Sequence, residues 1–83
     1  MIKSTYDFEN KIISIWNVTN NEKHLTYYLA DLDSNLTFSN GWVNFPPFGY
    51  CTLDVSYFES PIGLRIYMYK EDELVYMQDH YWS

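Results

Sequence analysis

The sequence predicts a mainly β protein, a small single-domain antiparallel meander of about five to seven short strands. Apolar and polar residues alternate with a period of two in most readable segments. Tyrosine, tryptophan and β-branched residues, which fit pleated strands, fill those segments. The 83 residues have the length of one domain, residues 1–83, and an apolar content of 47% excludes intrinsic disorder. We expect the sheet to curl into a small barrel or to fold into a sandwich, which would cover its apolar side.

The N-terminal segment fits either one short helix or a strand. Residues 4–7, Ser-Thr-Tyr-Asp, have the pattern of a helix capping box. The alternative is a strand or irregular lead-in with Ile2, Ser4, Tyr6 and Phe8 on one face. This second interpretation is slightly favoured.

Two β-rich segments follow, at residues 11–18 and 23–32, and they predict a hairpin. The residues between them, Thr19-Asn20-Asn21-Glu22, have turn chemistry, because asparagine tolerates a positive φ.

The middle of the chain contains two short strand candidates, at residues 36–38 and 42–45. They flank Ser39-Asn40-Gly41, and Asn-Gly is a strong signal for a two-residue hairpin turn. Residues 45–49, Phe-Pro-Pro-Phe-Gly, are predicted to be a loop, because two consecutive prolines cannot donate to a sheet. The aromatic-proline bond in this loop is a candidate for the cis form.

The clearest strand covers residues 51–57. Its apolar positions alternate with polar ones, which places four side chains on one face: Cys51, Leu53, Val55 and Tyr57.

Residues 62–69 and 74–82 predict an antiparallel hairpin around the polar break Lys70-Glu71-Asp72-Glu73. On the first of these strands, Leu64, Ile66 and Met68 share one face. Arg65, Tyr67 and Tyr69 share the opposite face, so the two tyrosines are expected on the surface if the apolar triplet is core.

The charge is unevenly distributed along the chain. The formal net charge is −6, and a pI near 4.5 argues against direct binding to nucleic acid. Acidic and basic residues balance in residues 1–30, so the whole imbalance lies in residues 31–83. This distribution favours an acidic face that docks on a basic partner. The plain alternative is a scatter of carboxylates that keeps a small domain in solution.

The sequence contains no complete catalytic, metal or cofactor motif. Asp31-x-Asp33-x-Asn35 opens like a calcium loop, but Leu36 and Trp42 stand where glycine and glutamate are needed. The single cysteine and the two histidines lack the paired spacing of a zinc site. We therefore expect a protein that is not an enzyme and that holds no metal and no cofactor.

The same observations bear on location. One cysteine allows no internal disulfide, and the N-terminal residues lack the apolar run of a signal peptide. No segment approaches the ~20 apolar residues of a membrane helix. The expectation is a soluble cytoplasmic protein that does not bind membranes.

Carboxylates and tyrosines of the later segments predict a surface that binds a basic protein, possible targets being a nuclease or another nucleic-acid-acting factor. The carboxylates would occupy positions where phosphates normally sit, as in small phage anti-defence inhibitors and toxin-immunity proteins. The predicted contact residues are Asp31, Asp33, Asp54, Tyr67, Tyr69, Glu71, Asp72, Glu73 and Asp79.

Two other function classes stay open. One is a carbohydrate- or peptide-binding module that uses Trp42, Phe45 and Phe48 as an aromatic platform. The other is a homo-oligomer, a structural subunit that associates through an uncovered strand edge.

Overall fold

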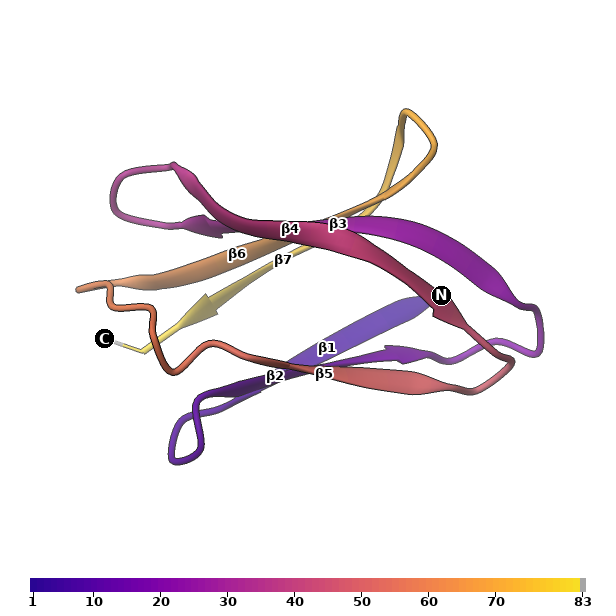
Figure 1. The fold of residues 1–83 in the computed structure, drawn as a ribbon, viewed down its shortest axis with the longest axis horizontal. Coiled ribbons are helices and arrows are strands. Elements are labelled where there is room, and N and C mark those ends of the chain that lie inside the picture. Colours follow the sequence, from indigo (N-terminus) through magenta and orange to yellow (C-terminus); the bar gives the residue numbers. More distant parts are fainter. Residues whose placement is uncertain (83) are drawn as a thin grey trace. The chain divides into compact units, whose positions relative to one another are not determined.

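The computed structural model describes residues 1–82, which form seven strands in two antiparallel sheets and contain no helix (Figure 1). The all-β antiparallel class is therefore confirmed. Contacts divide the chain into two units, each with one sheet. Unit 1 contains residues 1–23 and 44–59, and unit 2 contains residues 24–43 and the described residues from 60 onward. Whether the two sheets pack as a barrel or as a sandwich stays a prediction.

The sheet of unit 1 consists of β1 (Ile2–Asp7), β2 (Ile12–Asn17) and β5 (Tyr50–Asp54), in the order β1-β2-β5. The N-terminal segment is thus a strand, and the capping-box interpretation is wrong. Alternate residues of β1 and β2 are buried, among them Ile13 and Ile15, which are both 0% exposed. Ser4 lies opposite Ile15 and is buried with them.

The predicted hairpin between residues 11–18 and 23–32 does not form. β2 pairs with β1 and β5, and the later segment belongs to the other sheet. The asparagine-rich connection is held instead by Asn17, whose side chain binds the main chain of Thr19 and Asn21. These bonds satisfy the turn without a partner strand, so local turn chemistry did not identify the pairing.

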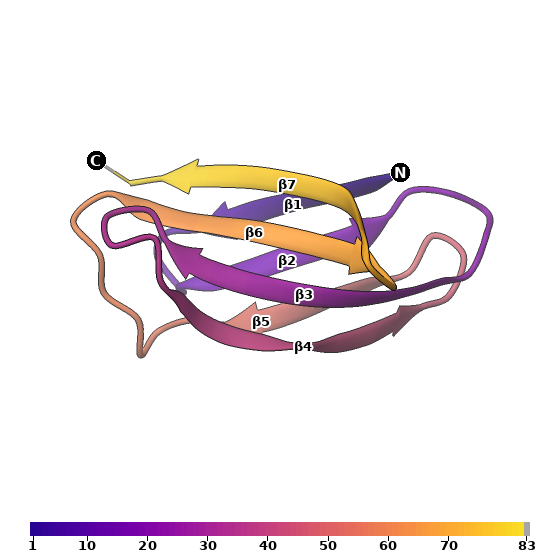
Figure 2. The ribbon, with the colours of Figure 1, turned by 90° about the horizontal axis from the view of Figure 1, so that it is seen from above.

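The sheet of unit 2 has the order β4-β3-β6-β7 (Figure 2). Its strands are β3 (Lys23–Asp31), β4 (Thr37–Phe45), β6 (Gly63–Lys70) and β7 (Glu73–Tyr81). The predicted hairpin of β6 and β7 is confirmed. Because β3 neighbours β6, and β2 neighbours β5, the strand order is not that of a sequential meander.

The Asn40-Gly41 hairpin is also wrong, because β4 runs without interruption through both residues. A side-chain carbon added at Gly41 would lie 2.8 Å from the hydroxyl oxygen of Tyr27. The glycine therefore permits the close approach of a ring, and it does not form a turn. The turn between β3 and β4 lies earlier, where Asn35 has a φ of 64°.

The proline segment leaves β4 after Phe45 and forms the predicted loop, and its peptide bonds are all trans. The strand predicted for residues 51–57 ends early, at Asp54. Its carboxylate accepts a hydrogen bond from the Ser56 main-chain N–H at 2.9 Å, which starts a turn. Val55 is still buried, but Tyr57 lies beyond the strand and is 65% exposed, so it does not share the environment of Val55 as the predicted common face implies.

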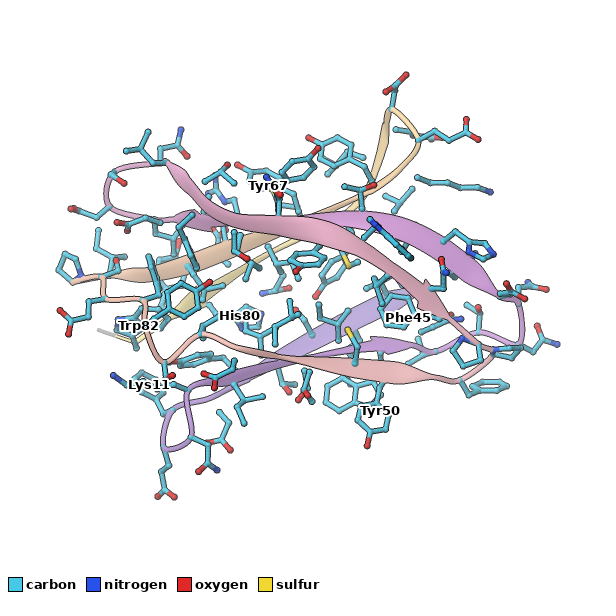
Figure 3. The ribbon with its side chains drawn as sticks, viewed as in Figure 1. Lys11, Phe45, Tyr50, Tyr67, His80 and Trp82 are labelled. Carbon is cyan, nitrogen blue, oxygen red and sulfur yellow. The ribbon has the colours of Figure 1, made fainter. Side chains whose placement is uncertain are left out.

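The two faces of β6 differ as the sequence predicts. Leu64, Ile66 and Met68 are each 0% exposed. Tyr67 projects from the other face, which we call the tyrosine face (Figure 3). The β3–β6 and β6–β7 registers place five side chains on this face: Tyr28, Arg65, Tyr67, Tyr69 and Asp79. In the described chain, no helix is long and apolar enough to cross a membrane.

Candidate functional site

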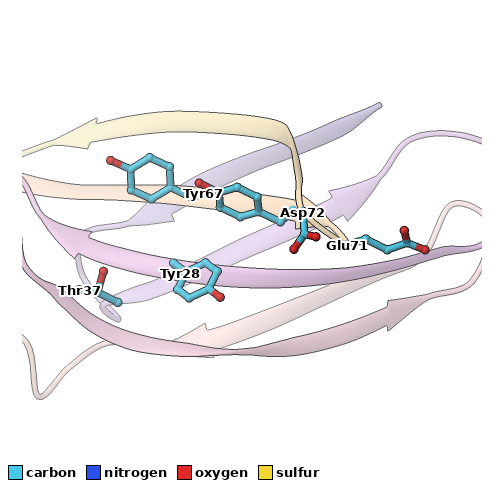
Figure 4. A pocket seen from close by; sticks show the side chains of 6 residues that line it. Tyr28, Thr37, Tyr67, Glu71 and Asp72 are labelled. Carbon is cyan, nitrogen blue, oxygen red and sulfur yellow. The ribbon is translucent and has the colours of Figure 1, made fainter.

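A pocket of about 360 Å³ opens on the tyrosine face of unit 2 (Figure 4). The register places Tyr28 of β3 directly opposite Tyr67 of β6, and Tyr69 lies two residues further along β6. The residues that line the pocket are Tyr28, Thr37, Tyr67, Tyr69, Glu71 and Asp72. Three aromatic rings and the carboxylate of Asp72 thus lie around one concave site, whereas the side chain of Glu71 extends from its rim away from the rings (Figure 4).

The rings of Tyr28 and Tyr69 are nearly perpendicular. Their centroids are 5.6 Å apart and their planes make an angle of 89°. This edge-to-face contact orients two of the walls, because each ring limits the rotation of the other. Two walls of the pocket are therefore rings that hold each other in place.

The acidic part of the pocket comes from the turn between β6 and β7, Lys70 to Glu73, which we call the acidic turn. Glu71, Asp72 and Glu73 are exposed. None of the three forms an ion pair or a side-chain hydrogen bond within residues 1–82. Glu71 has a φ of 57°, a conformation that glycine and asparagine adopt at lower cost. The fold therefore does not account for a glutamate at this position.

Beside the pocket, on the same face of the sheet, Arg65 contacts the ring of Tyr67 and the carboxylate of Asp79. The guanidinium of Arg65 donates from Nε and Nη2 to the two carboxylate oxygens of Asp79. Nη1 donates to the Tyr67 hydroxyl at 3.3 Å, and the guanidinium carbon lies 5.9 Å from the centre of the Tyr67 ring. Tyr81 donates to Asp79 at 3.2 Å. Because Arg65 is bound to it, the pKa of Asp79 is held below its usual value.

The predicted contact residues are therefore only partly brought together. Tyr67, Tyr69, Glu71 and Asp72 line the pocket, and Glu73 follows them at the start of β7. Asp79 lies on the same face, but its charge is compensated by Arg65.

Asp31 and Asp33 lie at the far end of β3. Asp31 pairs with Leu64, whereas the pocket residue Tyr69 pairs with Thr26, so about 17 Å of strand separates them. The Asp31 carboxylate accepts hydrogen bonds from the Ser60 hydroxyl at 2.7 Å and from the Asp33 N–H at 2.8 Å. These bonds, that of Ser60 above all, lower the pKa of Asp31.

Asp54 belongs to unit 1, where its carboxylate caps a turn and its pKa is lowered by the hydrogen bonds of Ser56. The contribution of Asp31, Asp33 and Asp54 to partner binding stays a prediction. The carboxylates of Asp31 and Asp54 have turn-forming roles that do not need a partner.

Sequence reasoning missed Tyr28 and Thr37 as pocket residues. Tyr28 precedes the buried Leu29 on the strand, so its place on the opposite, half-buried face was readable from the sequence, but its place beside Tyr67 depends on the β3–β6 pairing. The aromatic platform expected for sugar or peptide binding does not form as proposed, because Phe45 is only 1% exposed.

The role of Asp31 predicts a pH-dependent loss of stability. We expect Asp31→Asn to lower the urea midpoint of unfolding at pH 7, and we expect this difference from wild type to shrink steadily as the pH falls below about 4. The folded pKa is below the unfolded value of ~3.9, so the stabilisation is present above that value and is lost as pH falls through the folded pKa. Denaturation curves between pH 2 and 7 would measure this. Asp33→Asn is the matched control, and a constant difference between Asp31→Asn and wild type at every pH would contradict the assignment.

No group of three or more histidine, cysteine, aspartate or glutamate side chains within residues 1–82 is placed to bind a metal ion. Cys51 is half-buried, and burial raises the pKa of its thiol, which keeps it protonated at neutral pH. The chemistry of the pocket is therefore that of its hydroxyls, rings and carboxylates.

Comparison of the chain with protein-family models, with curated proteins and with solved structures gives no match.

Proposed function

We propose that this protein is a non-enzymatic inhibitor that binds a basic, nucleic-acid-acting protein through the tyrosine face and the acidic turn. Binding would cover the surface on which the partner holds phosphates, as phage anti-defence proteins and toxin-immunity proteins do. One observation carries the proposal: three tyrosines line an open pocket whose rim is the acidic turn, and neither Glu71 nor Asp72 there has an ion-pair partner in residues 1–82.

Charge supports a basic partner. Unit 2 has six acidic side chains against two basic ones, a net charge of −4 out of the total of −6. Arg65 already neutralises Asp79, whereas the acidic turn has three carboxylates against Lys70 alone and none of the three forms an ion pair within residues 1–82. A concentrated charge of this kind accelerates association with an oppositely charged partner, and added salt weakens the effect.

The tyrosines support the proposal that this face is a protein-binding interface, which charge alone would not indicate. Tyrosine contributes a large contact area with few rotatable bonds, and it is common among the residues that dominate binding energy. Four strands of eight or nine residues form a face of about 30 by 19 Å, or roughly 600 Å² in projection. A stable complex buries about 800 Å² per partner. The tyrosine face together with the acidic turn is of this size.

Self-association is the second candidate, and one observation favours it. β7 is an edge strand of its sheet, and Leu74, Val75 and Met77 on it are 44–50% exposed. An apolar edge can pair with a second copy. Sedimentation of the protein alone distinguishes the two functions. A stable homo-oligomer would favour self-association through β7, and a monomer would favour binding to a different protein.

The experiment is affinity capture from the lysate of the native host with two charge-matched variants. Glu71→Gln/Asp72→Asn removes two charges from the acidic turn, and Glu9→Gln/Glu59→Gln removes two from exposed positions of unit 1. We expect wild type and the unit 1 variant to retain the same basic protein. The acidic-turn variant should retain at least fivefold less, because two charge-assisted contacts are lost.

Salt and nucleic acid supply the remaining readouts. Retention should fall as ionic strength rises to about 0.5 M, and the partner's own nucleic acid should compete for binding. Equal retention of the partner by the two variants would contradict the proposal. A captured partner that is acidic, or one that binds this protein and its nucleic acid at the same time, would also contradict it.

A further inference from the structure

We infer that the pocket on the tyrosine face receives a single arginine side chain of the basic partner. In this arrangement the guanidinium would pack against the tyrosine rings and bind the carboxylates of the acidic turn. The inference rests on the proposed function and names the group that is recognised.

Arg65 shows how this sheet face holds a guanidinium. Its guanidinium lies near the Tyr67 ring, donates a hydrogen bond to the Tyr67 hydroxyl oxygen and forms a two-point contact with the Asp79 carboxylate. The three elements of this site are an aromatic ring, a phenolic oxygen and a carboxylate. They are the partners that a planar, delocalised cation prefers.

The pocket offers the same three elements on the other side of Tyr67. Tyr67 lines the pocket and also contacts Arg65, so the two sites share one ring. Tyr28 and Tyr69 supply further rings and hydroxyls, and Asp72 supplies a carboxylate beside them, with Glu71 at the rim and its side chain directed outward (Figure 4). A volume of about 360 Å³ is at the lower end of ligand pockets, which suits one side chain better than a nucleotide or an oligosaccharide.

Electrostatics favour a cation over a neutral group. The carboxylates of Asp72 beside the rings and of Glu71 at the rim have no ion-pair partner in residues 1–82, and tyrosine faces attract cations within about 6 Å. Arginine is favoured over lysine because the guanidinium is less strongly hydrated, stacks flat on rings and binds carboxylates at two points. An anionic or neutral peptide group would leave the acidic turn uncompensated.

The test is a titration of the isotope-labelled full chain, followed by NMR. The probes are N-acetyl-arginine methylamide, its lysine equivalent and its citrulline equivalent, which has nearly the shape of arginine without the charge. We expect arginine to shift the signals of the pocket residues with a dissociation constant on the order of millimolar. Lysine should bind about threefold more weakly and citrulline at least tenfold more weakly.

Variants locate the binding. Tyr28→Leu and Tyr69→Leu should each weaken arginine binding by about two- to fivefold, the range expected for one exposed cation–ring contact. Tyr50→Leu is the control, because Tyr50 belongs to unit 1 and its ring is open to the probe, being 66% exposed. Shifts that spread over unit 1, equal binding of citrulline or lysine, or no saturable shift up to about 0.1 M arginine would each overturn the inference.

The two proposals fail separately. If Tyr28→Leu and Tyr69→Leu retain the captured partner fully while the acidic-turn variant loses it, the arginine pocket is wrong and the proposed function stands. If arginine binds the pocket but no basic protein is captured, the pocket stands and the proposed inhibitor function is wrong.

Discussion

Gly63→Ala is expected to lower the free energy of unfolding by about 4 kcal/mol or more, the largest single effect that the fold predicts. Gly63 has a φ of 154°, which residues with a side chain rarely adopt. An added side-chain carbon would lie 2.1 Å from the carbonyl oxygen of His80 and 2.9 Å from the α-carbon of Tyr81. Both are main-chain atoms of β7, so β6 and β7 would have to separate at the point where Gly63 pairs with Tyr81.

Chemical denaturation followed by circular dichroism measures this loss, and a chain that no longer folds at 25 °C agrees with it. Gly41→Ala is an informative control. The atoms near its added carbon belong to the movable Tyr27 ring, so the loss should be only about 1–3 kcal/mol. A Gly63→Ala variant within 1 kcal/mol of wild type would show that the two strands are further apart than described.

Asn17→Leu is expected to lower the free energy of unfolding by about 3 kcal/mol. Asn17 is 1% exposed, and its amide nitrogen donates to the carbonyl oxygens of Asn21 at 2.7 Å and Pro46 at 3.1 Å. Its side-chain oxygen accepts hydrogen bonds from the N–H and the hydroxyl of Thr19. Leucine would leave these partners without their bonds, and each unsatisfied buried group costs about 1–3 kcal/mol.

The control for Asn17 is Asn20→Leu, an exposed asparagine of the same connection. Its free energy of unfolding should stay within about 0.5 kcal/mol of wild type. If the two leucine variants were equally stable, Asn17 would not be the residue that holds the connection and the proline loop in unit 1.

The sequence predicts the fold best at β6 and β7, although it misses the equally local pairing of β1 with β2. The alternation of Leu64, Ile66 and Met68 with Arg65, Tyr67 and Tyr69 correctly predicts both faces of β6, and the polar break correctly predicts its hairpin with β7. Pairing between distant segments has no such local signal. β2–β5 and β3–β6 are joined across long stretches of chain, and their registers depend on which faces become buried together.

Asparagine and glycine misled the prediction because each has more than one use. Asn20, Asn21 and the Asn40-Gly41 pair look like hairpin turn residues in the sequence. The first two belong to a connection that leads from one sheet to the other and is held by the buried Asn17, and Gly41 makes room for a ring. Only the tertiary environment distinguishes these roles from a turn.

Some of the acidic residues also have a structural role that the sequence did not indicate. Asp7, Asp31 and Asp54 each stand at the end of a strand, and each accepts a hydrogen bond from the main-chain N–H two residues later. This pattern forms turns, so part of the acidic composition serves the fold. The acidic turn and the pocket it lines are the part that the fold does not explain, and Tyr28 joins them only through the β3–β6 register.

The central claim is that the protein binds its partner through the tyrosine face and the acidic turn. Amide hydrogen exchange of the chain, alone and saturated with the captured basic protein, tests it most directly. We expect new protection in the acidic turn and in the adjoining residues of β3, β6 and β7, with β1, β2 and β5 unchanged. New protection confined to β1, β2 and β5, with the acidic turn exchanging as in the free protein, would contradict the claim.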